Sequence, residues 1–411
     1  MPGPEVQLRE RLRRLAGLDR LLPALEGLPP TYLVGGAVRD LLRGANAVDM
    51  DLAVEGNARS VARALAERLG GEAREHERFG TARVRTGELT FDLATTRREA
   101  YDEPGALPRV SEALLDEDLG RRDFTINAMA VGLTGDDLGH LYDPRGGLAD
   151  LEEGVVRVLH EGSFMDDPTR LLRAVRYEVR LGFRMDPATE GLARRAATEG
   201  ALRTVSGARV RDELMDLLGE PQAPAGVRRM HDLGLDRSLH PALGAEPGLV
   251  ASASLGAAAI GADRALAALA ALCAGAPRRL GRWLSDLHLT AAERDDVARA
   301  VRVAPRLVRE LRAHEHQPSQ LRALLGAEPP VSLALAMALG APHDPILRWA
   351  TDLRTVRLEI TGDDLLAAGV PEGPGLGRAL DETLNLKLDG LVSGRDEELE
   401  TALAVAGEAA R

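Results

Sequence analysis

Asp49 and Asp51, two aspartates two positions apart, are the first residues in the chain whose types and spacing suggest chemistry. Neighbouring carboxylates repel each other, and a divalent cation relieves that repulsion. Mg²⁺ fits this role, because it prefers oxygen ligands and completes its shell with phosphate oxygens. Such a pair is also common on protein surfaces that bind no metal, so it is a weak signal by itself.

The residues before this pair are suited to a polyphosphate. Gly35 and Gly36 open a predicted helix, whose N-terminal amides and positive dipole end favour an anion. Arg39, one turn into that helix, can add a charge-assisted contact. A lone Gly-Gly pair is more often a simple turn. The glycines, Arg39 and the two aspartates together suggest nucleotidyl transfer.

These residues need a frame of strand, helix and strand to hold them. An apolar run at 32–34 predicts the first strand, and residues 49–54 predict a second strand that carries both aspartates on one face. A helix is expected at about 57–69, with further strands near 72–76, 81–86 and 89–95. The pattern predicts an α/β domain with a small mixed sheet. Asp92, in the last strand, is either a third carboxylate of the site or a strand-edge residue.

The stretch from Gly35 to Asp51 resembles the signature of the nucleotidyltransferase superfamily. More closely, it is similar to the bacterial group that joins class II tRNA CCA-adding enzymes with the related poly(A) polymerases. The resemblance is strong over about 31–215 and weaker beyond. It implies an α/β nucleotidyltransferase catalytic domain followed by an all-α C-terminal half. It also implies that Asp49 and Asp51 are catalytic and hold Mg²⁺, and that Gly36 and Arg39 bind the triphosphate.

Residues 121–128, with the sequence RRDFTINA, form a second candidate motif. They place two arginines and a carboxylate beside an asparagine that can hydrogen-bond a ribose hydroxyl. The alternative is a helix start with Asp123 as N-cap and the arginines in solvent. The string resembles the RRDFT-type motif of the family. That resemblance implies that Arg122 contacts the triphosphate and that Asp123 and Asn127 organise the sugar side.

Residues 165–182 form a third motif, in which Asp167 is a predicted helix N-cap and Pro168 the first helical residue. Arg170, Arg173 and Arg176 follow at steps of three and share one flank of the helix. Such an arginine stripe is more often a solvated face. The string is similar to the base-reading motif of the family, EDxxR, although aspartate replaces the usual glutamate at position 166.

An aspartate and an arginine together can select a nucleobase. A carboxylate accepts a hydrogen bond from the exocyclic amino group that C and A share, whereas U and G present a carbonyl there. Asp167 and Arg170 could therefore admit CTP and ATP and exclude UTP and GTP. The resemblance implies that Arg173 and Arg176 support this pocket or contact phosphate.

Residues 95–119 contain two prolines and a glycine and have no clean periodicity, so we predict a long loop. Long loops in compact domains are often functional. In the resembled family a mobile loop lies at this point and is implicated in adding the terminal A. Its presence argues against an enzyme that adds only CC.

The net charge of −12 excludes a chain that is basic overall, so any RNA contact must use local patches. The candidate basic patches lie on predicted helices and contain Arg278, Arg279, Arg282, Arg302, Arg306, Arg309 and Arg312. The alternative is that these arginines are solvated helix faces that bind no RNA. The single cysteine excludes an internal disulfide. We expect a cytoplasmic protein with no membrane contact, because no apolar segment is long enough for secretion or spanning.

The chain has 411 residues, which is too long for one hydrophobic core. We expect a catalytic head at 1–150, a helical base-reading neck at 151–220, and a helical RNA-binding body and tail at 221–411. The resemblance implies a tRNA 3′-end nucleotidyltransferase that adds CCA, or its terminal A, from CTP and ATP without a template. Its partner would be the tRNA acceptor end, and the oligomeric state stays open.

Two other functions remain as alternatives. One is a poly(A) polymerase of the same family, whose frequent basic C-terminal extension is not seen in this acidic, alanine-rich end of the sequence. The other is a non-catalytic RNA-binding protein, against which the intact Asp49–Asp51 and Asp167–Arg170 pairs argue. The sequence leaves open the choice among full CCA, CC-only and A-only addition.

Overall fold

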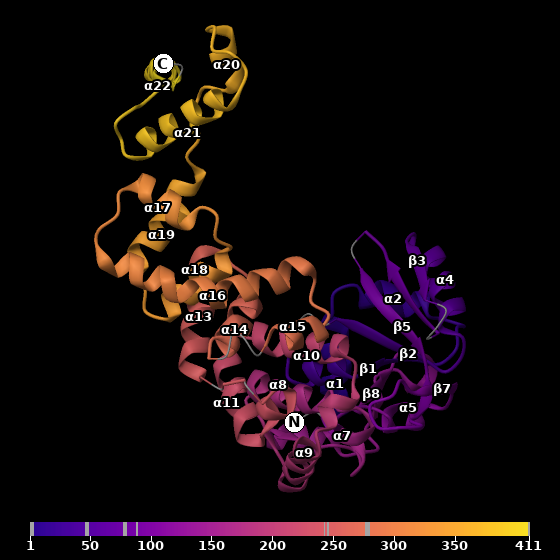
Figure 1. The fold of residues 1–411 in the computed structure, drawn as a ribbon. Coiled ribbons are helices and arrows are strands. Elements are labelled where there is room, and N and C mark those ends of the chain that lie inside the picture. Colours follow the sequence, from indigo (N-terminus) through magenta and orange to yellow (C-terminus); the bar gives the residue numbers. More distant parts are fainter. Residues whose placement is uncertain are drawn as a thin grey trace. The chain divides into compact units, whose positions relative to one another are not determined.

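The computed structural model describes residues 4–45, 49–76, 80–87, 89–241, 243–244, 246–275 and 280–409 (Figure 1). The chain divides into two compact units. The first unit contains Met1–Glu213 and Asp232–Leu239, and the second contains Leu214–His231 and His240–Arg411. The expected domain boundaries near residues 150 and 220 stay predictions.

A seven-stranded mixed sheet forms the centre of the first unit. Its strands are β1 (Thr31–Val34), β2 (Met50–Val54), β3 (Glu72–His76), β4 (Thr81–Arg85), β5 (Thr90–Thr95), β8 (Ala130–Gly132) and β9 (Leu141–Tyr142). They lie in the order β3-β4-β5-β2-β1-β8-β9. Strands β2 and β5 are parallel, and the other neighbours are antiparallel. The predicted α/β catalytic domain with a small mixed sheet is confirmed.

Four helices accompany the first strands: α1 (Pro4–Arg14), α2 (Leu18–Ala24), α3 (Gly36–Leu42) and α4 (Ala58–Leu69). Helix α4 packs against β3, β4 and β5 (Figure 1). It begins where the Asn57 side chain accepts a hydrogen bond from the Ser60 amide at 3.1 Å, and it ends at Gly70 in a left-handed conformation. Val61, Leu65 and Leu69 recur at helical spacing and are buried, so this face anchors α4 to the sheet.

The prediction of a long loop at residues 95–119 is wrong. Strands β6 (Arg97–Ala100) and β7 (Arg109–Glu112) form an antiparallel hairpin, and helix α5 (Leu115–Gly120) follows. All four residues of β7 are exposed, and β6 is also mostly polar, with no buried residue. Neither strand therefore has the alternation of apolar and polar residues that indicates a strand in a sequence. Thr96 anchors the base of the hairpin, since its hydroxyl donates hydrogen bonds to the carbonyls of Val54 and Ala113 at 3.2 and 2.7 Å.

Short elements and helices complete the first unit. They are η2 (Thr125–Asn127), η3 (Gly135–Asp137), α6 (Gly147–Glu153), β10 (Val155–Val156), α7 (Ser163–Asp166), α8 (Arg170–Leu181), β11 (Arg184–Met185), α9 (Pro187–Glu199), η4 (Ala201–Thr204) and α12 (Leu235–Leu239). Helix α8 begins at Arg170, three residues after the expected N-cap. The Asp167 side chain still accepts a hydrogen bond from the Thr169 amide at 3.1 Å, as a cap does.

Helices α10 (Gly207–Gly219) and α11 (Ala223–Leu233) each cross the division between the units. The other elements described in the second unit are α13 (Pro247–Ile260), α14 (Arg264–Cys273), α15 (Gly281–Asp286), α16 (Ala291–Ala313), α17 (Pro318–Leu325), α18 (Pro330–Ala338), α19 (His343–Thr351), η5 (Leu353–Thr355), α20 (Gly362–Ala367), α21 (Pro374–Leu388) and α22 (Arg395–Ala409). Every regular element described here is helical, which confirms the predicted all-α C-terminal half.

Alanine and glycine allow the helices of the second unit to approach closely. Helices α13, α14, α16 and α18 pack against one another, and a Cβ atom placed on Gly256 of α13 would lie 3.3 Å from the Ala334 carbonyl oxygen of α18. No single helix in the described ranges is long and apolar enough to cross a membrane. The bent pair α17 and α18 passes that test of length and composition when the two are taken together.

Candidate active site

A cavity of about 550 Å³ lies within the first unit, a size typical of small-molecule sites. Its walls come from the start of α3, strand β2, the segment after α5, helices α8 and α10, and the β6–β7 hairpin. The lining residues are Gly35, Gly36, Arg39, Asp51, Glu99, Tyr101, Arg121, Arg122, Asp123, Asn127, Asp167, Thr169, Arg170, Arg173, Tyr177, Arg180, Arg209, Asp212 and Glu213. The structure therefore brings together all the predicted site residues except Asp49 and Arg176.

The turn between β1 and α3 needs glycine for two reasons. Gly35 has a φ of 68°, in the left-handed region that L side chains rarely adopt. A Cβ atom on Gly35 would also lie 2.6 Å from a terminal nitrogen of Arg122. Gly36 then begins α3, and no side chain caps that helix start. The turn thus places the Arg122 guanidinium against the first residues of α3.

The two metal-binding candidates differ in local structure. Strand β2 begins at Met50, so Asp51 lies in the strand and Asp49 lies just before it, contrary to the prediction that one strand carries both. The Asp51 amide donates a hydrogen bond to the Asp49 carbonyl at 3.0 Å. Burial raises the pKa of Asp51, and the charges of Asp92 and Asp49 raise it further, while Arg122 lowers it. A cation at this point would relieve that repulsion, so the donor set fits a divalent metal.

Asp92 lies beside Asp51, because β2 and β5 pair with these two residues in register. Strand β5 has β2 on one side and β4 on the other, so the strand-edge alternative is wrong. Both carboxylate oxygens of Asp92 accept hydrogen bonds from Arg83, each at 2.7 Å. The described residues contain no group of three or more His, Cys, Asp or Glu side chains arranged to hold a metal ion. A role for Asp92 as a third carboxylate of the site stays a prediction.

A chain of polar contacts joins four of the predicted nucleotide-binding residues. Arg39 donates to the Asn127 side chain at 2.8 Å, and Asn127 donates to Asp123 at 2.9 Å. Arg173 of α8 donates to the other oxygen of Asp123, at 2.9 and 2.7 Å. Burial would raise the pKa of Asp123, but Arg173 and the Asn127 hydrogen bond outweigh it and lower that pKa. Asp123 is therefore an ionised link between segments, not the helix N-cap of the alternative interpretation.

The arginine stripe on α8 faces protein and not solvent. Arg170 is buried, and Arg173 and Arg176 both pair with Glu213 of α10, at 2.9 and 3.2 Å. The guanidinium groups of Arg39, Arg173 and Arg176 all lie within 6 Å of the Tyr177 ring centroid. These contacts exclude the solvated-face alternative and fix α8 against α3 and α10.

The predicted base-reading residues both line the cavity but hold different partners. Arg170 donates to the Ser163 hydroxyl at 2.7 Å and to the Arg121 carbonyl at 2.8 Å. Asp167 pairs with Arg209 of α10 at 2.8 Å. Asp166, at the position where the family has glutamate, lies 3.8 Å from the His160 ring and is not part of the lining. The departure from the family motif therefore lies outside the cavity wall.

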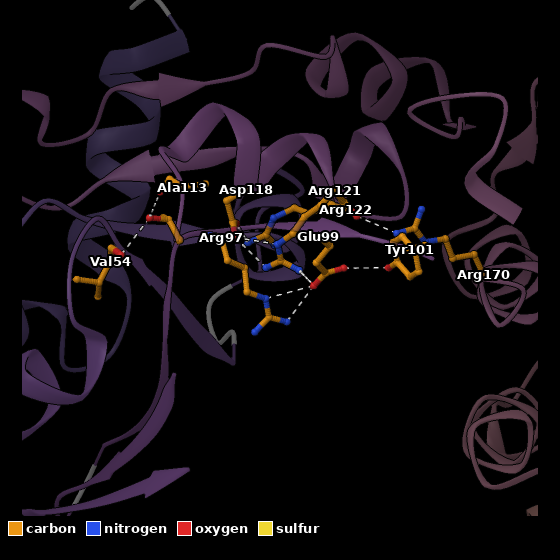
Figure 2. Close-up of polar contacts among 10 residues, drawn as sticks. Val54, Arg97, Glu99, Tyr101, Ala113, Asp118, Arg121, Arg122 and Arg170 are labelled. Carbon is orange, nitrogen blue, oxygen red and sulfur yellow. Dashed lines mark hydrogen bonds and ion pairs between the residues drawn. The ribbon is translucent and has the colours of Figure 1, made fainter. Parts of the chain in front are cut away.

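Sequence reasoning missed the hairpin residues of the site (Figure 2). Glu99 accepts hydrogen bonds from Arg121 at 2.8 Å, from Arg97 at 3.1 and 3.2 Å, and from the Tyr101 hydroxyl at 2.9 Å. Burial and the Glu99 charge raise the pKa of Tyr101, so its phenol stays a neutral donor. Buried Asp118 accepts from Arg121 and Arg122. The runs of acidic and basic residues at 97–103 and 116–122 were the available signal.

Two family profiles match the chain. The one described as "Poly A polymerase head domain" matches residues 31–157, and the one described as "Probable RNA and SrmB- binding site of polymerase A" matches residues 182–246. The "CC-adding tRNA nucleotidyltransferase" of Deinococcus radiodurans is 34% identical over 375 residues, covering 90% of this chain and 88% of the relative. The chain belongs to the family of tRNA nucleotidyltransferases and poly(A) polymerases.

Other relatives in the same family are named for adding A instead of CC. The "A-adding tRNA nucleotidyltransferase" of Geobacter sulfurreducens is 36% identical over 402 residues, covering 92% of this chain and 46% of the relative. The chain spans about half or less of the length of several such curated relatives.

Solved structures in the tRNA nucleotidyltransferase family share the fold. "The structure of CCA-adding enzyme apo form II" has a TM-score of 0.77 and 32% identity, covering 98% of this chain and 96% of that one. "Thermotoga maritima CCA-adding enzyme complexed with tRNA_CCA" has a TM-score of 0.71 and 30% identity, with the same coverage. The resemblance read from the sequence is confirmed at the level of family and fold.

Proposed function

We propose that the chain is a tRNA 3′-end nucleotidyltransferase that adds CCA, or its terminal A, from CTP and ATP without a nucleic-acid template. One observation carries the proposal: a single cavity holds Asp51, the arginine beside the Gly-Gly turn, and the Asp167 and Arg170 side chains. Carboxylates for a metal, a cation for phosphates and a pair for base edges are the parts that template-free nucleotide selection needs. Relatives named for adding A, CC or CCA support the tRNA substrate.

Asp49 and Asp51 are the proposed ligands of Mg²⁺, with phosphate oxygens of the substrate completing its shell. Bound there, Mg²⁺ would neutralise charge on the phosphates and lower the pKa of the attacking 3′-hydroxyl. The RNA 3′-hydroxyl attacks the α-phosphorus in line, and pyrophosphate leaves. Asp51 is the better-supported ligand, because it lines the cavity and the charges of Asp92 and Asp49 repel its ionised carboxylate.

Arg122 is the proposed main contact for the triphosphate. Its Nε is buried and has no hydrogen-bond partner among the described residues, and its guanidinium lies against the Gly35 turn. A phosphate oxygen would satisfy that donor. Gly36 and Arg39 are proposed to assist. Arg39, however, is buried and already bonded to Asp40 and Asn127, so a phosphate contact would require it to exchange partners.

Asp123 and Asn127 are proposed to organise the sugar side of the nucleotide, and Asp167 and Arg170 to read its base. Asp167 would accept from the amino group that C and A share, and Arg170 would donate to the neighbouring ring position. Arg173 and Arg176 would support this pocket by holding α8 against Asp123 and Glu213. Side chains would thus replace a template.

The proposed organisation assigns catalysis to residues 1–150, base reading to 151–220, and tRNA binding to 221–411. The helical C-terminal part would hold the tRNA acceptor end by shape and backbone contacts. A protein acting on tRNA would work in the cytoplasm. A poly(A) polymerase is the second candidate, since the matching head-domain profile carries that name. A non-catalytic RNA-binding protein is the least favoured candidate.

One experiment separates these functions. Transcripts that end at the discriminator base, at C and at CC are offered with each nucleotide triphosphate singly, and the products are mapped. Stepwise incorporation that stops at CCA supports the main proposal. Repeated ATP incorporation on unrelated RNA would indicate a poly(A) polymerase. Absence of incorporation on every transcript would contradict any catalytic function.

A further inference from the structure

The Asp167 carboxylate uses its two oxygens differently. Oδ1 accepts hydrogen bonds from the Thr169 amide at 3.1 Å and from the Thr169 hydroxyl at 2.6 Å, and it also pairs with Arg209 at 2.8 Å. Oδ2 accepts no hydrogen bond from any residue in the described part of the chain, and Asp167 lines the cavity. One oxygen therefore anchors the side chain, and the other is available to a ligand.

Among the described residues, Arg209 is the only partner of the Asp167 carboxylate that comes from a different element. It lies on α10 and is about 40 residues away in sequence, whereas Thr169 belongs to the same turn as Asp167. A second nitrogen of Arg209 donates to the carbonyl of Gly105 at 3.3 Å. The guanidinium group thus holds two acceptors at once, which its planar fork geometry allows.

Gly105 lies in the turn of the β6–β7 hairpin, and this turn is held in place. The Gly105 amide donates to the Met165 carbonyl at 3.1 Å, directly before the base-reading motif. Gly105 has a φ of 71°, and a Cβ atom there would lie 2.3 Å from the Thr204 hydroxyl oxygen. The turn, Arg209 and Asp167 therefore form one connected group, of which Arg209 and Asp167 line the cavity.

We propose that Arg209 is a positioning residue for base selection. It orients Asp167 so that Oδ2 faces the nucleobase, and it links that carboxylate to the hairpin turn through Gly105. This role rests on the proposed function, because it assigns a selecting task to Asp167. Arg209 does not touch the reacting atoms.

Base selection by Asp167 requires a positioning residue because hydrogen bonds are directional. A carboxylate discriminates between an amino group and a carbonyl only if its free oxygen stays at one place, and without Arg209 the Asp167 side chain would be held, among the residues that the structure describes, only by Thr169 of its own turn. Loss of Arg209 would leave the oxygen that faces the base free to change position, so selection between an amino group and a carbonyl would relax.

The test compares three variants of the full chain with the wild type. Arg209→Gln removes the charge, Arg209→Lys keeps the charge without the fork, and Arg194→Gln is the matched control. Arg194 is exposed and pairs with Glu190 on α9, outside the cavity. The selectivity among the four nucleotides is measured in two ways, by incorporation into tRNA transcripts and by equilibrium binding in the absence of RNA. Hydrogen exchange measures a third quantity, the exchange rate of the backbone amides of residues 102–109.

Arg209→Gln is expected to lower the preference for CTP and ATP over UTP and GTP roughly tenfold, because the Asp167 carboxylate loses its ion-pair partner. Arg209→Lys is expected to retain most of that preference, because the ammonium group still reaches Asp167. Both variants are expected to exchange faster at residues 102–109. Arg194→Gln is expected to match the wild type in all three measurements.

Two results would overturn the inference: a wild-type nucleotide ratio in Arg209→Gln, or an equal loss of preference in Arg194→Gln. Unchanged exchange at residues 102–109 in Arg209→Gln would overturn the link to the hairpin. If the wild type incorporates no nucleotide into tRNA, the proposed function fails. The binding ratios would still decide the role of Arg209, and equal binding of all four nucleotides by the wild type would overturn it.

Discussion

At the scale of single residues, the site contains two carboxylates, Asp51 and Asp123, whose surroundings shift their pKa values in opposite directions. Burial raises the pKa of Asp51, and the nearby charges of Asp92 and Asp49 raise it further. Asp123 is surrounded by donors and a guanidinium group, which lower its pKa. A carboxylate held in repulsion is suited to bind a cation, whereas a fully bonded one is suited to hold segments together.

The first prediction concerns the carboxylates proposed to bind the metal. Asp49→Ala and Asp51→Ala should each abolish nucleotide incorporation, because the chain loses one of its two proposed Mg²⁺ ligands. Binding of tRNA should stay within a few-fold, since neither residue is assigned to RNA. Incorporation assays in Mg²⁺ and tRNA binding in its absence measure the two effects. Near-normal turnover of Asp49→Ala would show that this ligand is wrongly assigned.

The second prediction concerns the stability supplied by Asp123. Asp123→Asn removes one of the two carboxylates that pair with the half-buried Arg173 guanidinium and leaves only Glu213, so it should destabilise the first unit by about 1–3 kcal/mol. The folded-state pKa of Asp123 is lowered, so its contribution is fully present above the ordinary aspartate pKa of about 4 and is lost as pH falls from there through the lowered folded-state pKa. The difference in melting temperature between the wild type and Asp123→Asn should therefore narrow as pH falls from 7 to 3. A gap that is constant across this range would contradict the ion-pair account.

The third prediction concerns base selection. Asp167→Ala and Arg170→Ala should each relax selectivity against UTP and GTP by about one to two orders of magnitude, because an unpaired buried hydrogen-bonding group costs roughly 1–3 kcal/mol. Arg122→Ala should instead lower the use of all four nucleotides without changing their ratio. Relative incorporation of the four nucleotides measures both. If Asp167→Ala is slower but keeps the wild-type ratio, base selection lies elsewhere.

At the scale of elements, the sequence predicted what depends on local pattern. Strands β1 to β5 and helix α4 follow local residue patterns, so their bounds were foreseen within about a residue. The short strands β8 and β9 of the same sheet were not predicted. Strands β6 and β7 are mostly exposed and polar, so no pattern distinguished them from a loop. Partners such as Arg209 and Gly105 are about 100 residues apart, and contacts over that separation cannot be read from one sequence.

The fourth prediction concerns the β6–β7 hairpin as a functional element. Gly105→Ala should displace the hairpin turn, because the new Cβ atom would clash with Thr204 and the left-handed backbone becomes strained. If the hairpin acts as the loop of the resembled family does, A addition should fall more than C addition. Single-step incorporation of ATP and of CTP on matched transcripts measures the two. Equal loss of both would mean that the hairpin is only structural, and the argument against CC-only activity would lapse.

At the scale of the whole molecule, charge sets the mode of RNA binding. The chain carries a net charge of −12, so it is repelled by RNA on average, and only local arginine clusters can attract phosphates. Helix α16 carries four arginines of the predicted patches, and Arg302, Arg306 and Arg309 are exposed on it. Arg278 and Arg279, which were expected in the same patches, lie outside the described residues.

The last prediction tests whether α16 binds tRNA. The double reversal Arg306→Glu and Arg309→Glu should weaken tRNA binding and make its salt dependence shallower, because fewer counterions are released when fewer phosphates are neutralised. Arg306 is a suitable target, since its side chain is 63% exposed and its partner Glu310 lies at a distant 3.9 Å. Binding titrations from low to physiological salt give both the affinity and the slope. The double reversal Arg59→Glu and Arg63→Glu on α4 changes the net charge equally and should have a smaller effect on both. If the α16 variant and the wild type share one affinity and one slope, these arginines are solvated surface, and tRNA is held elsewhere on the chain.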